Sequence, residues 1–342
     1  MSDNNTSSSV AAGTPVSTDA TVRTIQFTVP LRIRIELGAA GVDQAVSVGL
    51  GPVAVGFETR KPAPRTYTDR NGYDPAFLAG TSISFESLLA PITDRLAPTI
   101  DQKTVLTYRN FSVAMHRIRR LSVATAVNID GQRTQSMGRS DVWILDPRLR
   151  ETYQTGPEVY ANNDLDRGHM VRRLDPVWGA QAQQANDDTF HYTNSCPQHA
   201  GLNQKAWADL EDYILNNTKL AQLKVSVFTG PVFGEADIPY RGVLLPLQFW
   251  KVAAVIKKDG QLSMTGYLLS QKNLLVNLRE GIAEDGFGAF RTYQVPLSQI
   301  QALTELDFSP YFVNDPLHRA GAGRFEVTTD LREIQNPDDL IL

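Results

Sequence analysis

The side chains best suited to chemistry fall between residues 166 and 212. His169 follows directly after Asp166-Arg167-Gly168, while Asn203 and Glu211 stand on a later segment. Hydrolysis of a phosphodiester needs an activated water and positive charge against the phosphoryl and leaving oxygens. An imidazole with a pKa of about 6.5 can accept a proton at neutral pH, so His169 is the candidate general base. Taken alone, it could equally be a buried structural histidine.

Apolar residues recur every four positions from Leu202 to Ile214, which predicts an amphipathic helix. Asn203 is a poor helix former, and its neutral oxygen suits Mg²⁺, which tolerates a site with few protein ligands. Glu211 follows about two turns later, roughly 12 Å along the helix axis. Both residues therefore cannot bind one ion directly, and we expect Glu211 to act through metal-bound water. A surface carboxylate is the alternative reading of Glu211.

Arginines are enriched between residues 117 and 150, although the chain carries a formal net charge of −4. An acidic chain is not a protein coated in positive charge, so contact with nucleic acid must be local. Part of this set either faces phosphate or occupies solvated strand and loop positions. The arginines are Arg117, Arg119, Arg120, Arg133, Arg139, Arg148 and Arg150.

Three motifs together resemble the DNA/RNA non-specific endonuclease family, the endonuclease G-like ββα-metal (His-Me finger) nucleases. They are Asp166-Arg167-Gly168-His169, then Thr193-Asn194 followed by Pro197-Gln198, then Asn203-Gln204-Lys205-Ala206-Trp207 with Leu210-Glu211-Asp212. A looser similarity runs from Tyr67 to Phe312. The resemblance implies an α+β fold with a mixed, mostly antiparallel central sheet flanked by helices.

The resemblance also implies the reaction. It is Mg²⁺-dependent hydrolysis of DNA and RNA without sequence preference, giving 5′-phosphate and 3′-hydroxyl ends. By this analogy His169 is the general base, and Asn203 is the direct protein ligand of Mg²⁺, for which Mn²⁺ can substitute. Glu211 takes the indirect role that the helix spacing suggests.

Supporting roles follow from the same resemblance. Arg167 would position or neutralise phosphate, Asp166 would brace the loop, and Asn194 would support the metal shell. Members often carry an arginine four residues after the helix glutamate, where this chain has Leu215. They also carry an arginine about thirty residues before the histidine, for which Arg139 is our choice and Arg148 the rival. Arg139, Arg148 and Arg167 are thus the candidate nucleic-acid contacts.

Length and composition suggest how the chain is divided. Its 342 residues, 42% of them hydrophobic, can bury one large core or two modest ones. Residues 1–22 are polar and predict a disordered tail. Alternation from Ile25 to Leu37, with an extended region from Val46 to Phe57, predicts a β-hairpin arm at 23–60. The arm either adds strands to the main sheet or binds a partner, and residues 61–342 form the nuclease domain.

The remaining segments supply a scaffold. We expect strands at 105–114, 121–129, 225–228, 249–256 and 262–268, and a short helix at 298–305. Four other histidines have no motif role and are expected to be structural or exposed. They are His116, His191, His199 and His318.

The cysteine count and the lack of targeting signals give expectations about thiol chemistry and localisation. Cys196 is the only cysteine, which excludes an intrachain disulfide and fits a reducing compartment. It also leaves a thiol nucleophile or zinc site without partners. With neither a signal peptide of the Sec type nor a membrane-spanning apolar run, we expect a cytoplasmic protein that binds no membrane. Export by a signal-independent route stays open.

Two hypotheses of different class remain. The first is a nuclease acting on DNA and RNA; the second is a catalytically idle or partner-activated nucleic-acid-binding module, such as a bacterial toxin or defence effector. An unrestrained cytoplasmic nuclease would attack its own genome, so we expect an inhibitor or activator, or control through the 23–60 arm. Deleting residues 1–60 should then alter activity or a homodimeric assembly without unfolding the core.

Overall fold

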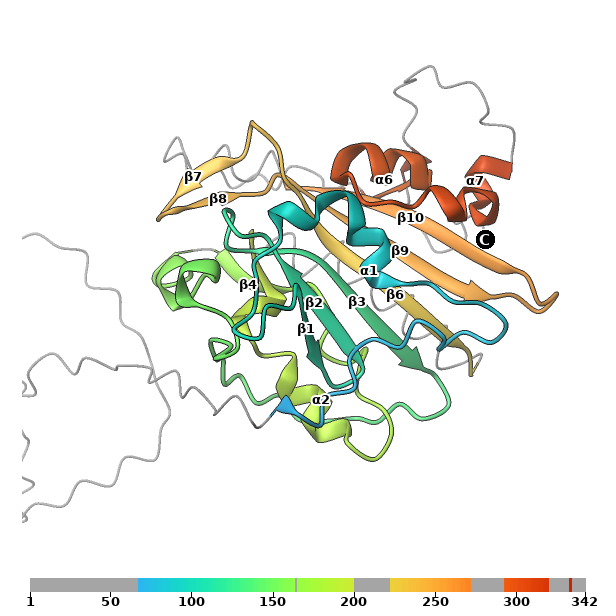
Figure 1. Ribbon diagram of the computed structural model, residues 1–342, viewed down its shortest axis with the longest axis horizontal. Helices are drawn as coiled ribbons and strands as arrows, with labels where there is room; N and C mark the ends of the chain where they lie inside the picture. Colours follow the sequence, from blue (N-terminus) through green and yellow to red (C-terminus); the bar gives the residue numbers. More distant parts are fainter. Residues whose placement is uncertain (1–66, 164, 200–221, 272–291, 320–331, 334–342) are drawn as a thin grey trace, which may run out of the picture. The chain divides into compact units, whose positions relative to one another are not determined.

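An eight-stranded sheet forms the centre of the chain (Figure 1). The computed structural model describes residues 67–163, 165–199, 222–271, 292–319 and 332–333. All the sheet's strand pairs are antiparallel, in the order β1-β2-β3-β6-β9-β10-β11-β12. The strands are β1 (Val105–Tyr108), β2 (Phe111–Met115), β3 (Ser122–Asp130), β6 (Lys224–Val232), β9 (Gln248–Ile256), β10 (Leu262–Ser270), β11 (Thr292–Val295) and β12 (Arg332–Glu333). The α+β class is confirmed, and the described sheet is antiparallel rather than mixed.

The sequence prediction of strands was sound in the centre of the sheet and wrong at its edge. Segments 121–129, 249–256 and 262–268 correspond to β3, β9 and β10. Segment 105–114, expected as one strand, is instead a tight hairpin in which Tyr108 pairs with Phe111. Asn110 makes the turn with φ of 66°, a conformation that Asn tolerates better than most residues.

Helices cover one face of the sheet, and Figure 1 shows α1 and α6 lying across the strands. Phe85 of α1 and Ile300 of α6 join the same apolar cluster as Phe228 and Trp250 from β6 and β9. The elements of this layer are α1 (Phe85–Leu89), η2 (Ala90–Arg95), α6 (Leu297–Thr304), η6 (Ser309–Asn314) and α7 (Pro316–Arg319). The helix predicted at 298–305 is therefore confirmed as α6.

The opposite face of the sheet carries the segments that hold the motifs. Neighbouring residues of β6 point to opposite faces, so Val227 joins a second cluster that also contains Val113 and Val171. This cluster attaches the chain after His169 to the sheet. The elements of this layer are η3 (Glu151–Tyr153), η4 (Pro157–Val159), β4 (Leu165–His169), α2 (Ala182–Asp188), η5 (Tyr192–Asn194) and β5 (Ser195–His199).

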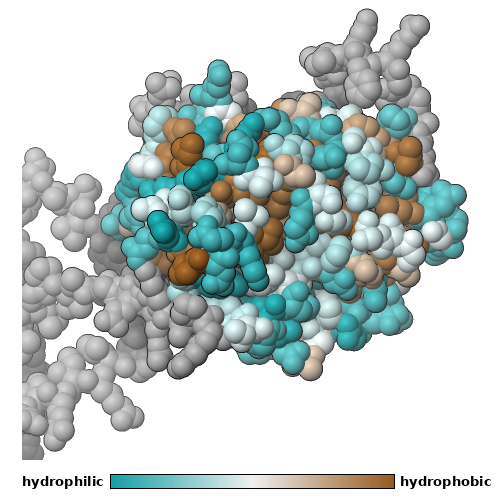
Figure 2. Space-filling view, viewed as in Figure 1, coloured by the Kyte–Doolittle hydropathy of each residue, from teal (hydrophilic) through white to brown (hydrophobic). Residues whose placement is uncertain are grey.

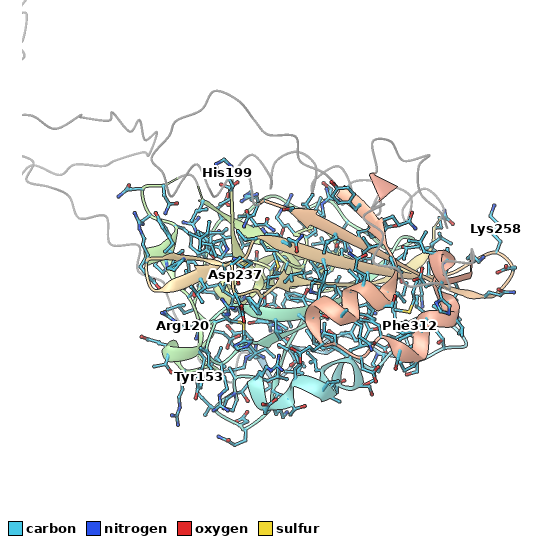
Figure 3. All side chains as sticks on the ribbon, turned by 90° about the horizontal axis from the view of Figure 1, so that it is seen from above. Arg120, Tyr153, His199, Asp237, Lys258 and Phe312 are labelled. Atoms are coloured by element: carbon cyan, nitrogen blue, oxygen red, sulfur yellow. The ribbon has the colours of Figure 1, made fainter. Side chains whose placement is uncertain are left out.

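A small hairpin, β7 (Ile238–Tyr240) paired with β8 (Val243–Leu245), completes the described structure. In Figure 3, Lys258 at the β9–β10 turn lies at the right-hand end of the drawn side chains, whereas His199 at the end of β5 lies at their upper edge. Figure 2 shows a mostly polar face on which apolar side chains are scattered. Among the described helices, none is long and apolar enough to cross a membrane. The predicted tail, the 23–60 arm and the helix from Leu202 lie outside the described residues.

Candidate active site

The site is built on the two-stranded pairing of β4 with β5. The strands run antiparallel, with His169 opposite Ser195 and Arg167 opposite Pro197. Because side chains alternate along a strand, Arg167 and His169 share one face of this pair. Asp166 lies on the other face, opposite Gln198. The motif therefore presents its arginine and histidine together.

An aromatic floor lies beneath these two side chains. The Trp143 ring centroid is 5.0 Å from that of His169, and the Arg167 Cζ lies 5.6 Å from the same indole. Phe190 meets the His169 ring edge-on at 5.4 Å, and Tyr160 lies 5.8 Å from the Arg167 guanidinium. Trp143, Phe190 and Tyr160 belong to one buried cluster, so the floor is part of the folded core.

His169 is held neutral by its surroundings. The residue is half-buried, and its Nε2 is covered and without a hydrogen-bond partner among the described residues. Burial, followed by the nearby guanidiniums of Arg139 and Arg173, lowers the pKa of His169 to about 3. Both causes disfavour the imidazolium, so the ring can accept a proton at neutral pH. With Nε2 covered, Nδ1 is the nitrogen that a water would meet.

Asn194 fixes the chain directly after His169. Its Oδ1 accepts from the Val171 amide at 2.8 Å, and its Nδ2 donates to the carbonyls of Val171 and Thr189, both at 3.0 Å. The Asn194 carbonyl also accepts from the Met170 amide at 2.9 Å. The side-chain amide is fully buried and engaged at both ends. Asn194 therefore holds the backbone at Val171 and Thr189 in place beside the site. We call this set of hydrogen bonds the Asn194 clip.

Arg139 lies beside the aromatic floor. Its Cζ is 5.7 Å from the Phe190 ring, and its Nε donates to the exposed Asp141 carboxylate at 2.5 Å. Since Arg139 also lowers the pKa of His169, the structure brings these two predicted residues together.

Arg148 lies instead within an internal ion pair. Its Nε and Nη2 donate to the two carboxylate oxygens of the fully buried Asp146 at 3.0 and 2.7 Å. Its Nη1 donates to the Thr107 carbonyl at 2.7 Å, and its Cζ lies 4.0 Å from the Tyr67 ring and 4.8 Å from the Tyr108 ring. Every edge of this guanidinium is engaged. Of the two rivals for a phosphate contact, this placement favours Arg139.

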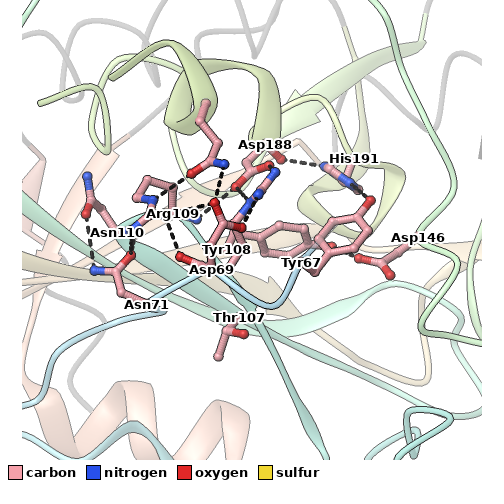
Figure 4. A network of polar contacts seen from close by, with 12 residues as sticks. Tyr67, Asp69, Asn71, Thr107, Tyr108, Arg109, Asn110, Asp146, Asp188 and His191 are labelled. Atoms are coloured by element: carbon pink, nitrogen blue, oxygen red, sulfur yellow. Dashed lines mark hydrogen bonds and ion pairs between the residues drawn. The ribbon is translucent and has the colours of Figure 1, made fainter. Parts of the chain in front are cut away.

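The network around Arg148 reaches the segment that carries Asn194. Figure 4 shows the part of it formed by Tyr67, Tyr108, Asp146 and His191. The Tyr108 hydroxyl donates to Asp146 at 2.5 Å and accepts from the Thr193 hydroxyl at 2.6 Å. His191 bonds the Asp188 carbonyl through Nδ1 at 2.7 Å and the Tyr67 hydroxyl through Nε2 at 2.6 Å. A carbonyl only accepts, so Nδ1 carries the proton and Nε2 accepts from the tyrosine. His191 is structural, as expected.

A family model described as DNA/RNA non-specific endonuclease matches residues 91–314. The chain belongs to this family. It is 37% identical over 299 residues to the uncharacterized protein y4fB of Sinorhizobium fredii, covering 82% of this chain and 45% of that protein. It is 31% identical over 175 residues to mitochondrial endonuclease G of Bos taurus, covering 48% of this chain and 52% of that protein.

Other similarities within the family are weaker. The nuclease of Serratia marcescens is 25% identical over 147 residues, covering 40% of this chain and 54% of that protein. A crystal structure of the EndoG/EndoGI complex is 20% identical, covers 66% of this chain and 93% of that one, and gives a TM-score of 0.48. The chain spans about half the length of the curated relatives it matches.

The metal site predicted from the sequence falls on a segment that the structure does not describe. Asn203 and Glu211 both lie outside the described residues. Within the described ranges, no three His, Cys, Asp or Glu side chains form a group that could hold a metal ion. Burial raises the pKa of the Cys196 thiol well above its usual range, so this side chain stays protonated. That Asn203 binds Mg²⁺ and that Glu211 acts through metal-bound water therefore stay predictions.

Sequence reasoning missed three residues of the site. Trp143 and Phe190 form the floor, and Arg173 joins Arg139 in lowering the pKa of His169. The aromatic residues left no sequence signal, because apolar residues in loops resemble those of any core. Arg173 did leave one, since it belongs to an arginine pair directly downstream of the motif.

Proposed function

We propose that this chain is a metal-dependent endonuclease that hydrolyses phosphodiester bonds in DNA and RNA without sequence preference. The observation that carries the proposal is a neutral imidazole among guanidiniums. His169 is kept unprotonated, while Arg139 and Arg173 lie close enough to lower its pKa and Arg167 shares its strand face. A base beside cations suits attack of water on an anionic phosphodiester.

The protein's own groups have separate tasks in this reaction. Nδ1 of His169 takes a proton from the water that attacks the phosphorus in line with the leaving oxygen. Arg139 and Arg167 offset charge on the phosphoryl oxygens, a role that the planar guanidinium fork suits. Asn194 keeps the histidine in place through its hold on Val171 and Met170. The products would carry 5′-phosphate and 3′-hydroxyl ends.

The proposed cofactor is Mg²⁺, with Mn²⁺ as a substitute. When bound, the ion would offset charge on the leaving oxygen. Asn203 would hold it directly and Glu211 through its water. The named relatives support the proposal, because those with an assigned activity are called endonuclease or nuclease.

Plasmid nicking tests the proposal. Wild type and His169→Ala are each incubated with supercoiled plasmid in Mg²⁺ and in EDTA. We expect nicking by wild type with Mg²⁺ alone. His318→Ala is the matched control, because this histidine is exposed on α7, and it should cut like wild type.

Two results would overturn the proposal. Cutting by His169→Ala at the wild-type rate would show that His169 is not the general base. The wild type could also bind DNA and RNA without cutting them in either Mg²⁺ or Mn²⁺. The chain would then be a binding module or would require an activating partner.

A further inference from the structure

Arg173 is anchored by neutral partners near the candidate base. Its Nη1 donates to the Met137 carbonyl at 2.9 Å and to Asn186 Oδ1 at 3.0 Å. Asn186 is fully buried in α2, and Met137 stands two residues before Arg139. The guanidinium is thus fixed between a helix and the loop that carries Arg139.

This anchoring leaves one edge of the guanidinium unused. A guanidinium has five N–H donors, and the two on Nη1 are engaged. Across the described residues, the N–H groups on Nε and Nη2 of Arg173 have no hydrogen-bond partner, and no carboxylate pairs with this side chain. Nε–H and Nη2–H point the same way and match two oxygens of one anion. The half-buried residue retains solvent access on this edge.

In two other arginines of the chain, the same edge is filled by a carboxylate. Nε and Nη2 of Arg70 donate to the two oxygens of Asp188 at 2.7 and 2.9 Å. Nε and Nη2 of Arg148 grip Asp146 in the same way. The guanidinium of Arg173 is also held in place, but among the described residues no carboxylate fills its Nε–Nη2 edge. An anion with two oxygens in one plane would complete it.

The local charge favours such an anion. Burial, followed by the neighbouring cations Arg139 and Arg172, lowers the pKa of Arg173, and Asp141 opposes this only weakly. A guanidinium whose pKa is lowered by nearby cations lies in a region of positive potential. Arg139 affects the pKa of His169 more than Arg173 does. The Arg139 Cζ also lies 5.7 Å from the Phe190 ring, whose centroid is 5.4 Å from that of His169, whereas Arg173 is held at Met137 and Asn186. We therefore assign Arg139 to the phosphate that is cut and Arg173 to a position further along the substrate.

We propose that Arg173 binds, through its Nε–Nη2 edge, a phosphodiester neighbouring the one that is hydrolysed. This inference rests on the proposed nuclease function and adds a second phosphate subsite to it. The subsite predicts a preference for substrates with at least two linkages. Because the contact is to the backbone, it carries no sequence information.

Substrate length provides the test. A dinucleotide has one phosphodiester and no neighbour, whereas a trinucleotide supplies one. Arg173→Ala should lower kcat/KM on the trinucleotide about tenfold, as expected for loss of a charged hydrogen-bonded pair. On the dinucleotide, which has no neighbouring phosphodiester, the same variant should lose much less than this tenfold. In a second trinucleotide, the neighbouring linkage is replaced by a neutral methylphosphonate. This replacement should lower kcat/KM about tenfold for wild type and should lower it no further for Arg173→Ala.

Two variants separate binding from a structural effect. Arg173→Lys keeps the charge but loses the fork, so it should fall between wild type and Arg173→Ala. Arg117→Ala is the matched control, because Arg117 is exposed and, among the described residues, its side chain donates only to the Asp94 carbonyl. It should leave both substrates unchanged. Equal losses on dinucleotide and trinucleotide, or no loss on either, would overturn the subsite.

A binding assay keeps the subsite testable if the enzyme proves silent. In the full-length His169→Ala protein, affinity for a short single-stranded oligonucleotide is measured against salt concentration. Removing Arg173 should reduce the slope of log K against log salt by about 0.7. An unchanged slope refutes the subsite. Absence of cutting by wild type refutes the nuclease proposal separately.

Discussion

The side chain of Gln198 lies directly against the Cα of Gly168, on the face of β4 opposite His169. A Cβ at position 168 would stand 2.0 Å from Oε1 and 2.6 Å from Cγ of Gln198. Gln198 is fully buried, so its side chain has no open space to move into. Packing beneath the strand therefore requires glycine beside the catalytic candidate.

Gly168→Ala should destabilise the protein and reduce its activity. The added methyl group must displace a buried side chain, and overpacking of this kind costs roughly 1–3 kcal/mol. Because the displaced contact lies beneath β4, His169 should also lose its orientation. Urea unfolding measures the stability, and plasmid nicking below the unfolding transition measures the rate.

Two further variants make the Gly168 prediction specific. Gly138→Ala is the control, because a Cβ there meets nothing within 4 Å. It should change neither stability nor rate by a measurable amount. Gly168→Ala combined with Gln198→Ala removes the clash and should recover part of both losses. A double variant as impaired as the sum of the two single variants would contradict the packing account.

Asn194→Ala should be among the most damaging single changes near the site. It leaves the amide of Val171 and the carbonyls of Val171 and Thr189 without their side-chain partner. Losing several buried hydrogen bonds at once should cost roughly 3–4 kcal/mol and lower kcat through the freed backbone after His169. Thermal unfolding and nicking rates measure both effects.

Asn314→Ala is a useful comparison for Asn194. Its side chain makes one long hydrogen bond, from Nδ2 to the Leu262 carbonyl at 3.3 Å. A cost below about 1 kcal/mol and an unchanged rate are expected. If Asn194→Ala were no worse than Asn314→Ala, the proposed clip would be wrong.

The acid limb of the pH profile should lie well below the usual histidine range. His169 must be neutral to act as a base, and burial and two arginines lower its pKa to about 3. Activity is lost only as pH falls through that depressed pKa, so kcat/KM should stay flat down to roughly pH 5. Arg173→Ala removes one cation and should move the limb to higher pH. A wild-type limb near pH 6.5 would contradict the assignment.

The motifs alone predicted that Arg167 and His169 belong to one candidate site. His169 and Arg167 were expected to act together, and the β4–β5 register places them on one face. The sequence also predicted α6 and the sheet strands β3, β6, β9 and β10, because the pattern of apolar residues can be read from a single sequence. The edge hairpin at Arg109-Asn110 was missed, since a two-residue turn without glycine leaves little signal.

Long-range contacts account for the rest. Trp143 and Phe190 reach His169 only because distant loops fold beneath the strand pair. Arg148 looked like any basic loop residue until its pairing with Asp146 was visible. Sequence periodicity carries no information about which carboxylate a given arginine meets. The choice between Arg139 and Arg148 therefore needed the fold.

Arg148 should prove structural rather than a nucleic-acid contact. Arg148→Ala leaves the buried Asp146 carboxylate without its cation, which typically costs roughly 3–5 kcal/mol. The salt dependence of oligonucleotide binding, measured below the unfolding transition, should stay unchanged because no phosphate contact is lost. Adding Asp146→Asn removes the stranded charge and should recover part of the stability.

The pH dependence of this pair has a definite sign. Burial alone would raise the pKa of Asp146, but Arg148 helps to hold that pKa below the usual range. The pair therefore stabilises the fold above the unfolded pKa of about 3.9, and this stability is lost as pH falls through the folded pKa. Urea unfolding at several acidic pH values should show wild type losing stability toward acid more steeply than the double variant. A salt slope that falls by about 0.7 in Arg148→Ala, with little loss of stability, would return Arg148 to the substrate-binding surface.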